Sequence, residues 1–201
     1  ISCVDHCLQT KNYINVITAS KHPSFQWLNM EQAIEHCSSG VSVWDFACVN
    51  NKENPDLVVA SAGGTPTLEA LASIKILKKY LPNINIRYIN VVDLMKLISN
   101  EKHPHGLTDK EYNELFTTNK PIVFNFHGYP QLVHQLTYSR KNQNLHVRGY
   151  VEEGTITTPF DMRVLNGIDR FNLVLLAVKH LKIDNATKEK ITKDMQKKLN
   201  Y

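Results

Sequence analysis

Short apolar runs that alternate with helix-like segments constrain the fold of this chain most strongly. Residues 57–61 are almost entirely apolar, which is typical of a strand buried on both faces. Gly63–Gly64 follow as a turn, after which we expect Thr65 to cap a helix and Pro66 to take its first position. A second apolar run, residues 121–126, also precedes a helix-like segment. Strands that alternate with helices predict a sheet covered by helices on both faces.

The complete pattern predicts a three-layer α/β sandwich with a largely parallel sheet and right-handed crossovers. Two helix starts carry a capping box, at Asn29 with Gln32 and at Thr108 with Glu111. The stretch 41–54 is predicted to be irregular. The expected strands are residues 13–19, 57–61, 84–92, 121–126 and 145–150. The expected helices are residues 29–37, 65–81, 93–98, 108–116, 130–138, 159–169 and 171–181, with a lysine-rich helix in the tail.

Length and composition indicate the class of protein. The chain has 201 residues, of which 42% are hydrophobic and 21% charged, as in an ordinary globular domain. Its formal charge of +4 comes from basic residues that are spread along the chain until the tail, where lysines mix with acidic residues. Such a mixture on a helix is typical of a solvated face. We therefore expect no nucleic-acid partner.

The sequence also indicates no membrane partner and no secretory route. No apolar stretch approaches the roughly 18 residues of a spanning helix, and the first residues do not resemble a signal peptide. The four cysteines lack a zinc-ligand spacing and are expected to be reduced thiols: Cys3, Cys7, Cys37 and Cys48. We therefore expect a cytoplasmic protein. The chain begins at Ile1 without an initiator methionine, which suggests a natural neighbour upstream.

The Gly63–Gly64 turn is the local feature that most resembles a ligand site. A glycine turn before a helix leaves backbone N–H groups free, and the helix dipole favours an anion there. The turn matches neither G-x-G-x-x-G nor the P-loop pattern, however, and tight turns need glycine for steric reasons alone. The structural interpretation is favoured, and the anion site stays open as the alternative.

Other candidate residues have ordinary explanations beside the functional ones. His127 follows an apolar strand and titrates near neutrality, as a ligand or base should, but such a histidine often only closes a loop. His103 and His105 look like metal ligands that lack a third partner, which is typical of a surface turn. Glu152 and Glu153 suit acid–base chemistry or a metal, but two exposed acids beside a turn explain them equally well.

A long motif occupies residues 146–162, HVRGYVEEGTITTPFDM. It closely resembles the carboxyl-terminal part of bacterial phosphoketolases, where H-x-x-G-Y-x-E-E-G-x-x-T-T-P-(F/Y)-D-M recurs, followed by an Asn and an Asp-Arg pair. Asn166 and Asp169–Arg170 supply the last two features here. The threonine-rich part of this motif is interpreted as architecture or an interface.

Three shorter segments carry the same resemblance. Residues 15–23, NVITASKHP, are similar to that family's N-x-x-x-x-(S/T)-K-Q-P stretch, and residues 57–67 and 90–94 also fit. The resemblance covers about residues 12–181. It implies the fold of a transketolase C-terminal domain, which is a three-layer α/β/α sandwich with a mixed, mostly parallel five-stranded sheet.

The resemblance further implies an activity and a domain organisation. Phosphoketolases split xylulose 5-phosphate, and often fructose 6-phosphate, with inorganic phosphate to give acetyl phosphate and an aldose phosphate. Thiamine diphosphate and Mg²⁺ carry the carbon chemistry. Residues 1–201 would form one C-terminal domain, with a core at about 12–181 and a lysine-rich helix over 182–201. Upstream domains would bind the cofactor and the metal, this chain would bind neither, and the enzyme would be a homodimer.

The resemblance carries over one site residue. Lys21 matches the family's lysine at the mouth of the active site, which holds the sugar phosphate of the substrate. His22 stands where the family usually has Gln, and we expect it beside the same phosphate. A lysine at the carboxyl end of a parallel strand would also lie where α/β sheets place ligands, and an ammonium group suits a phosphate. No catalytic residue and no metal ligand are expected in this chain.

Two alternatives to an enzyme domain stay open. One is a regulatory module that holds an anionic metabolite at the Gly63–Gly64 turn. The other is a purely structural, dimer-forming domain in which Lys21 contributes little. Titration with sugar phosphates and nucleotides distinguishes the first alternative, and substitution of Lys21 in the complete enzyme distinguishes the second.

Overall fold

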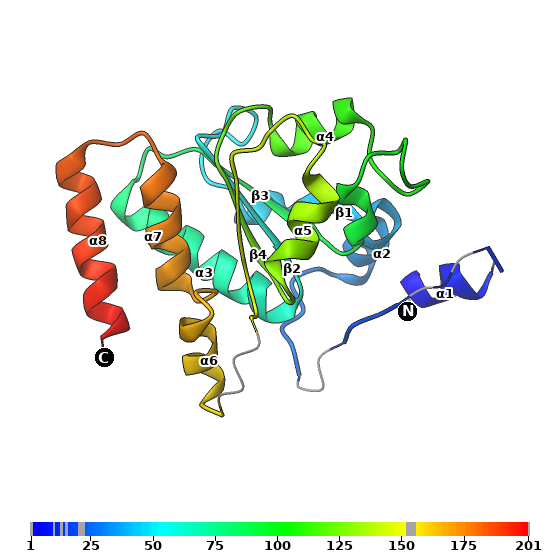
Figure 1. Ribbon diagram of the computed structural model, residues 1–201, viewed down its shortest axis with the longest axis horizontal. Helices are drawn as coiled ribbons and strands as arrows, with labels where there is room; N and C mark the ends of the chain where they lie inside the picture. Colours follow the sequence, from blue (N-terminus) through cyan, green and yellow to red (C-terminus); the bar gives the residue numbers. More distant parts are fainter. Residues whose placement is uncertain are drawn as a thin grey trace.

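The computed structural model describes residues 2–9, 11, 12, 14, 16–19, 23–151 and 156–200. A five-stranded sheet lies between two layers of helices (Figure 1). The strands are β1 Val41–Val43, β2 Leu57–Ala62, β3 Ile86–Val91, β4 Ile122–Phe126 and β5 Leu145–Gly149. The helices are α1 Ser2–Leu8, α2 Met30–Ser39, α3 Gly64–Tyr80, α4 Asp109–Phe116, α5 Pro130–Thr137, α6 Pro159–Leu165, α7 Arg170–His180 and α8 Asn185–Leu199, with short 3-10 helices η1 Asp45–Ala47 and η2 Leu94–Leu97.

The sheet is mixed and mostly parallel. Its strand order is β1-β3-β2-β4-β5, and β1 runs antiparallel to β3 while the other neighbours pair in parallel. In the centre, Ala60 of β2 is opposite Ile89 of β3 and Phe124 of β4. Parallel neighbours need crossover connections, which the helices between them supply. The three-layer sandwich with a five-stranded sheet expected from the sequence is confirmed.

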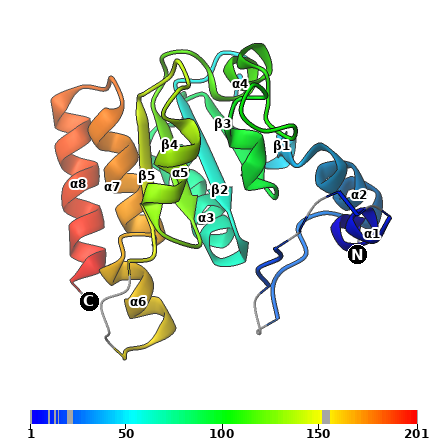
Figure 2. The ribbon, with the colours of Figure 1, turned by 45° about the vertical axis from the view of Figure 1, so that its right-hand side comes forward.

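Two apolar clusters hold the layers together, because successive residues of a strand point to opposite faces. Leu57 and Val59 of β2 join the cluster beneath α3, α7 and α8, whereas Val58 and Ala60 join the cluster beneath α4 and α5. Figure 2 shows α7 and α8 together on one side of the sheet. All six residues of β2 are buried, which explains why this strand reads as an unbroken apolar run.

The prediction of a first strand at residues 13–19 is wrong. The described residues of this stretch belong to no strand, and Ile14 and Val16 are 94% and 86% exposed. The place beside β3 is taken by β1, which lies in a stretch predicted to be irregular. β-branched residues favour a strand, but a strand also needs a partner, and only the tertiary fold decides which segment reaches the sheet edge.

Helix α8 belongs to the apolar core. Ile191 and Met195 are fully buried against the cluster beneath α3 and α7, and the hydroxyl of Tyr80 donates to Asp194 Oδ2 over 3.0 Å. The lysines of α8 lie on its other faces, as expected for a solvated surface. The core therefore extends beyond residue 181. None of the helices described, α8 included, is long and apolar enough to cross a membrane.

Met195→Ala should lower the free energy of unfolding by about 2–5 kcal/mol, because it removes a large apolar side chain from a closed core. Chemical denaturation followed by circular dichroism measures this loss. Lys193→Ala, an exposed position on the same helix, is the matched control and should change stability by no more than about 0.5 kcal/mol. Equal denaturation midpoints for the two variants would show that α8 does not stabilise the core.

Candidate functional site

The β2–α3 turn packs against the loop after β4 at the carboxyl edge of the sheet. Gly63 has a φ of +103°, which side chains rarely permit. A Cβ atom on Gly63 would lie only 2.6 Å from the Cβ atom of His127, in the loop after β4. The backbone N–H of His127 also donates to the carbonyl of Ala62 over 3.0 Å. Glycine is thus needed for both backbone conformation and close approach, which supports the structural interpretation of the turn.

The expected cap of helix α3 is wrong. The helix begins at Gly64, so Thr65 is not its N-cap and Pro66 is not its first residue. Gly63 takes the N-cap position without a side-chain hydrogen bond. The permissive backbone of the two glycines lets the helix start two residues earlier than the Thr-Pro pair indicated.

A buried polar network lies beneath this turn. The hydroxyl oxygen of Ser61 is 2.6 Å from the hydroxyl of Tyr88 and 3.0 Å from that of Thr67. Asn90 Nδ2 donates to Thr67 Oγ1 over 3.0 Å, and Asn90 Oδ1 is 2.9 Å from Nε2 of His36. Buried polar groups are costly unless they are paired, and paired ones fix a unique geometry. This network therefore fixes the first turn of α3 to β2 and β3.

His127 and Tyr150 form an aromatic pair above the same edge. Their ring centroids are 5.0 Å apart. Desolvation by the surrounding protein lowers the pKa of His127, so its imidazole is neutral at pH 7. Burial raises the pKa of Tyr150, against the opposing influence of Arg163. The histidine predicted as a ligand, base or loop-closing residue thus packs against Gly63 and Tyr150.

The segment that follows the predicted phosphate-binding residues crosses the glycine turn. A Cβ atom on Gly64 would lie 3.4 Å from the hydroxyl oxygen of Ser24. Lys21 and His22 themselves lie outside the described residues. Ser24, which follows His22 by two positions in the sequence, thus lies beside the turn at the carboxyl edge of the sheet. The described residues of 13–19, which were expected to form the strand before Lys21, belong to no strand.

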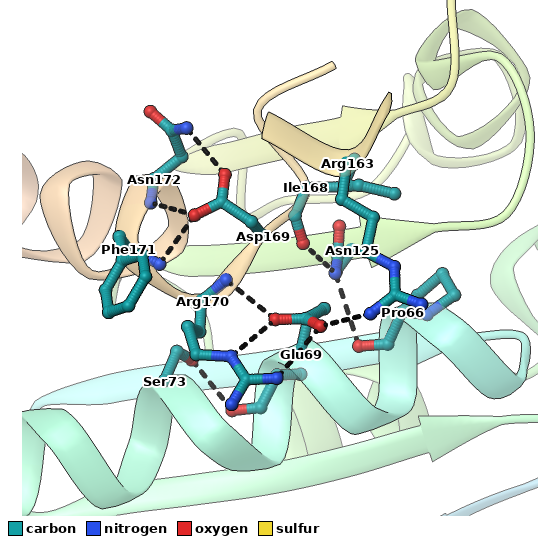
Figure 3. Close-up of polar contacts among 11 residues, drawn as sticks. Pro66, Glu69, Ser73, Asn125, Arg163, Ile168, Asp169, Arg170, Phe171 and Asn172 are labelled. Atoms are coloured by element: carbon teal, nitrogen blue, oxygen red, sulfur yellow. Dashed lines mark hydrogen bonds and ion pairs between the residues drawn. The ribbon is translucent and has the colours of Figure 1, made fainter. Parts of the chain in front are cut away.

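A buried carboxylate on α3 holds the helices that follow β5. The side chain of Glu69 is completely buried and lies between Arg163 of α6 and Arg170 of α7 (Figure 3). Its Oε1 accepts from Arg163 Nη1 over 2.9 Å and from Arg170 Nη2 over 3.1 Å. Its Oε2 accepts from the backbone N–H and from Nε of Arg170, over 3.0 and 2.8 Å. Two arginines and one backbone donor therefore saturate this carboxylate.

The charges of the arginines decide the protonation of Glu69. Burial by itself would raise the pKa of this carboxyl group. The hydrogen bonds and positive charge of Arg170, with a contribution from Arg163, outweigh burial and hold the pKa below its ordinary value. Glu69 is thus ionised at neutral pH and works as a fixed anionic anchor.

A buried amide extends this anchor to the sheet. Asn125 of β4 donates through Nδ2 to the carbonyls of Pro66 and Ile168, over 3.2 and 3.0 Å (Figure 3). Asp169 then accepts from the backbone N–H groups of Phe171 and Asn172, which caps α7. The end of β4, the start of α3 and the start of α7 are thereby fixed to one another.

The long motif and the asparagine that follows it cap helix α6 and hold the segment before this helix. Thr158 Oγ1 accepts from the backbone N–H of Asp161 and donates to its carboxylate, which starts α6. Asn166 Oδ1 accepts from the backbone N–H of Val151 over 2.6 Å, and Nδ2 of Asn166 donates to the carbonyl of Met162. The expected architectural role agrees with these contacts. Glu152 and Glu153 lie outside the described residues.

The described residues contain no group of three or more His, Cys, Asp and Glu side chains that could hold a metal ion. The backbone N–H of His105 donates to Nδ1 of His103, and the ring of His105 lies 3.4 Å from the carboxylate of Asp93. These contacts close a local turn, as the surface-turn interpretation of the two histidines predicted. Cys37 and Cys48 form no disulfide.

Glu69, Asn125 and Arg163 belong to none of the patterns that indicate a site in the sequence. One signal for Glu69 was present, because it is spaced by four residues from Ser73 and by eight from Leu77, on the buried face of α3. A carboxylate on a buried helix face requires a cationic partner. Which arginine supplies the charge could not be read from the pattern, since Arg163 and Arg170 lie about a hundred residues away in the sequence.

Glu69→Gln should lower the free energy of unfolding by about 3 kcal/mol at pH 7, because it leaves two arginines without their anion. The folded-state pKa of Glu69 is depressed, so its contribution is complete above the unfolded pKa of about 4.3 and is lost as the pH falls through the folded value. The difference between wild type and variant should therefore shrink in acid. Denaturant titrations at pH 7 and pH 3 measure both effects.

Glu189→Gln, at an exposed position of α8, removes the same charge and is the control, with an expected change within about 0.5 kcal/mol. A Glu69→Gln loss no larger than that of the control would contradict the anchor role.

Comparison with known proteins agrees with this architecture. The chain is 57% identical over 181 residues to a probable phosphoketolase of Clostridium acetobutylicum, covering 90% of this chain and 23% of that protein. It is 52% identical over 200 residues to a probable phosphoketolase of Rhodopirellula baltica, covering 99% of this chain and 25% of that protein. The chain therefore spans about a quarter of the length of these curated relatives.

The fold has a structural counterpart among transketolases. The transketolase from Leishmania mexicana superposes with a TM-score of 0.52 over 73% of this chain and 18% of its own, at 14% sequence identity. This likeness confirms the expected transketolase-type C-terminal fold. Residues 21–201 match the family described as the XFP C-terminal domain. The chain therefore belongs to the XFP C-terminal domain family, which relates it to the phosphoketolases.

Proposed function

We propose that residues 1–201 form the C-terminal domain of a thiamine-diphosphate-dependent phosphoketolase. The observation that carries this proposal is the 52–57% identity to probable phosphoketolases over nearly the whole chain. Because the chain spans only about a quarter of these relatives, the rest of the enzyme belongs to upstream domains. In this proposal the domain supplies substrate-phosphate binding and architecture, while the carbon chemistry takes place on the upstream domains.

The proposed reaction is the cleavage of xylulose 5-phosphate with inorganic phosphate to acetyl phosphate and an aldose phosphate. Fructose 6-phosphate is the second candidate substrate. The enzyme would be an aldehyde-lyase that works as a cytoplasmic homodimer. These assignments rest on the relationship to phosphoketolases and on the motif at residues 146–162.

The described residues of this chain do not fit a site for thiamine diphosphate and Mg²⁺. Carboxylate and amide oxygens normally supply the protein ligands of Mg²⁺. The described part of the chain holds no group of three or more His, Cys, Asp and Glu side chains that could hold a metal ion, and the buried carboxylate of Glu69 is saturated by two arginines. The relationship to phosphoketolases supports our proposal that the cofactor and the metal bind to upstream domains and that this domain supplies no catalytic residue.

Lys21 is the proposed phosphate ligand, with His22 beside it. The contact between Ser24 and Gly64 supports this role, because it brings the following segment to the carboxyl edge of the sheet. Ligands of α/β sheets gather at that edge. The ammonium group of Lys21 would pair with the dianionic phosphate of the sugar and orient the substrate toward the upstream domains.

The alternative of a regulatory anion site at the Gly63–Gly64 turn has less support. The hydroxyl of Ser24 lies close to Gly64, and the side chain of His127 packs against Gly63. The chain itself therefore occupies the space around both glycines. Crowding by the protein's own side chains favours the architectural role of the turn.

Lys21→Ala in the complete enzyme should reduce kcat/KM for the sugar phosphate by roughly ten- to a hundredfold, because a charge-assisted contact contributes about 1.5–3 kcal/mol. The melting temperature should hardly change, since an exposed lysine adds little stability. Steady-state kinetics and thermal denaturation measure the two effects. Lys11→Ala removes the same charge from an exposed position earlier in the segment and should leave kcat/KM unchanged. Equal kinetics for both variants would exclude Lys21 from the site.

The 201-residue chain alone should neither cleave xylulose 5-phosphate nor bind thiamine diphosphate, because the proposed cofactor ligands belong to upstream domains. Isothermal calorimetry with thiamine diphosphate and Mg²⁺ should show no heat of binding, while a cooperative thermal melt of the same sample verifies that the chain is folded. Micromolar affinity would contradict the assignment of the cofactor to the upstream domains.

A further inference from the structure

A hollow of about 580 Å³ lies at the amino ends of the strands, opposite the edge described above. Three connections enclose it, formed by residues 80–84 after α3, residues 119–121 before β4 and residues 180–184 between α7 and α8. Its volume is within the range of sites for small molecules. Because β2 and β4 have five or six residues, the two edges are roughly 15–20 Å apart. The hollow is therefore separate from the proposed phosphate site.

The hollow has an apolar floor. Ile84, Pro121 and Leu181 line it and are buried, and Leu81 and Ile183 complete its apolar wall. A flat apolar group placed against these side chains would lose its contact with water, which is the main favourable contribution in small-molecule sites. The floor is thus suited to an aromatic or similarly flat body.

Two lysines at the rim of the hollow have no partner within the described part of the chain. Lys120 and Lys182 line it, and within the described part of the chain neither ammonium group forms an ion pair or a hydrogen bond. The rim also carries two carboxylates, each of which accepts hydrogen bonds from amide groups of the protein. Asp56 Oδ2 accepts from the backbone N–H and Nδ2 of Asn85, over 3.0 and 3.1 Å. Asp184 caps α8 through the backbone N–H of Thr187.

A helix start and a histidine also border the rim. The first turn of α8 adjoins the hollow, and the carboxylate of Asp184 caps it. His180 also lines the hollow, and its ring stacks on that of His146 with centroids 3.4 Å apart. Asn144 is held in place by its contacts with His146 and with the carbonyl of Asn119. The imidazole of His180 is therefore fixed at the rim beside the two lysines.

We propose that this hollow binds a small organic anion with a flat apolar body, of the chemical class of aryl phosphates. Lys120 and Lys182 hold the anionic group, and the apolar floor receives the body. The bound molecule contacts the last residues of α3 and α7. The first residues of these helices, Gly64 and Arg170, lie at the opposite, carboxyl edge of the sheet. The proposal does not depend on the proposed enzymatic function, because it uses only residues of the opposite edge.

Phenyl phosphate is a suitable probe, with inorganic phosphate and phenol as its two halves. Titration of the 201-residue chain, followed by NMR of the backbone amides, should give saturable shifts confined to residues 56, 80–84, 119–121, 144 and 180–187. Each half should bind more weakly than phenyl phosphate, because it uses only the rim or only the floor. Inorganic phosphate binding as tightly as phenyl phosphate would overturn the proposal, as would the absence of saturable shifts up to ~10 mM.

Substitution of the two lysines tests the same site. Lys120→Ala and Lys182→Ala should each raise the Kd of phenyl phosphate about three- to tenfold, and the double variant about ten- to a hundredfold. Lys110→Ala, on α4 with a side chain that is 86% exposed, is the matched control and should leave the Kd unchanged. The same Kd in the double variant and in the control would overturn the proposal.

Discussion

The ion pairs of the buried Glu69 carboxylate with Arg163 and Arg170 hold together the helices at the carboxyl edge of the sheet. An ionised side chain without contact to solvent is tolerated only where cations and hydrogen-bond donors replace water. Glu69 satisfies this condition only when Arg163 and Arg170 both reach it, which happens when α6 and α7 are docked on the first half of α3. The requirement to neutralise one carboxylate thus specifies how the last third of the chain meets the α/β core.

The same region shows how polar groups fix a geometry that apolar packing leaves loose. Asn125 joins β4 to the backbone of α3 and to the turn before α7. In the first turn of α3, the hydroxyl group of Thr67 forms hydrogen bonds with the side chains of Ser61 and Asn90. Apolar side chains would tolerate small shifts of these elements, whereas directed hydrogen bonds do not. The loops that carry Gly63 and His127 are consequently held in one arrangement.

The two edges of the sheet differ in whether their charged side chains have partners within the protein. At the carboxyl edge the loops lie close together, the glycine turn is covered by Ser24 and His127, and the buried charges are satisfied within the protein. At the amino edge, Lys120 and Lys182 border an apolar hollow without partners of their own in the described chain. Long α3 and shorter α7 run between the edges, so that each helix contributes one end to each of them.

The sequence by itself determined the features that depend on neighbours in the chain. The capping boxes at Asn29 and Thr108 were predicted and are present, because each joins residues only three positions apart. Strands β2 and β4 were predicted for a similar reason, since short, mostly apolar runs mark strands buried on both faces. The tertiary structure alone decided that residues 41–43, and not residues 13–19, pair with β3, and that Glu69 is neutralised from α6 and α7. Strand pairing and ion pairing join residues far apart in the sequence, and the free energy of such contacts depends on which surfaces the folded chain brings together.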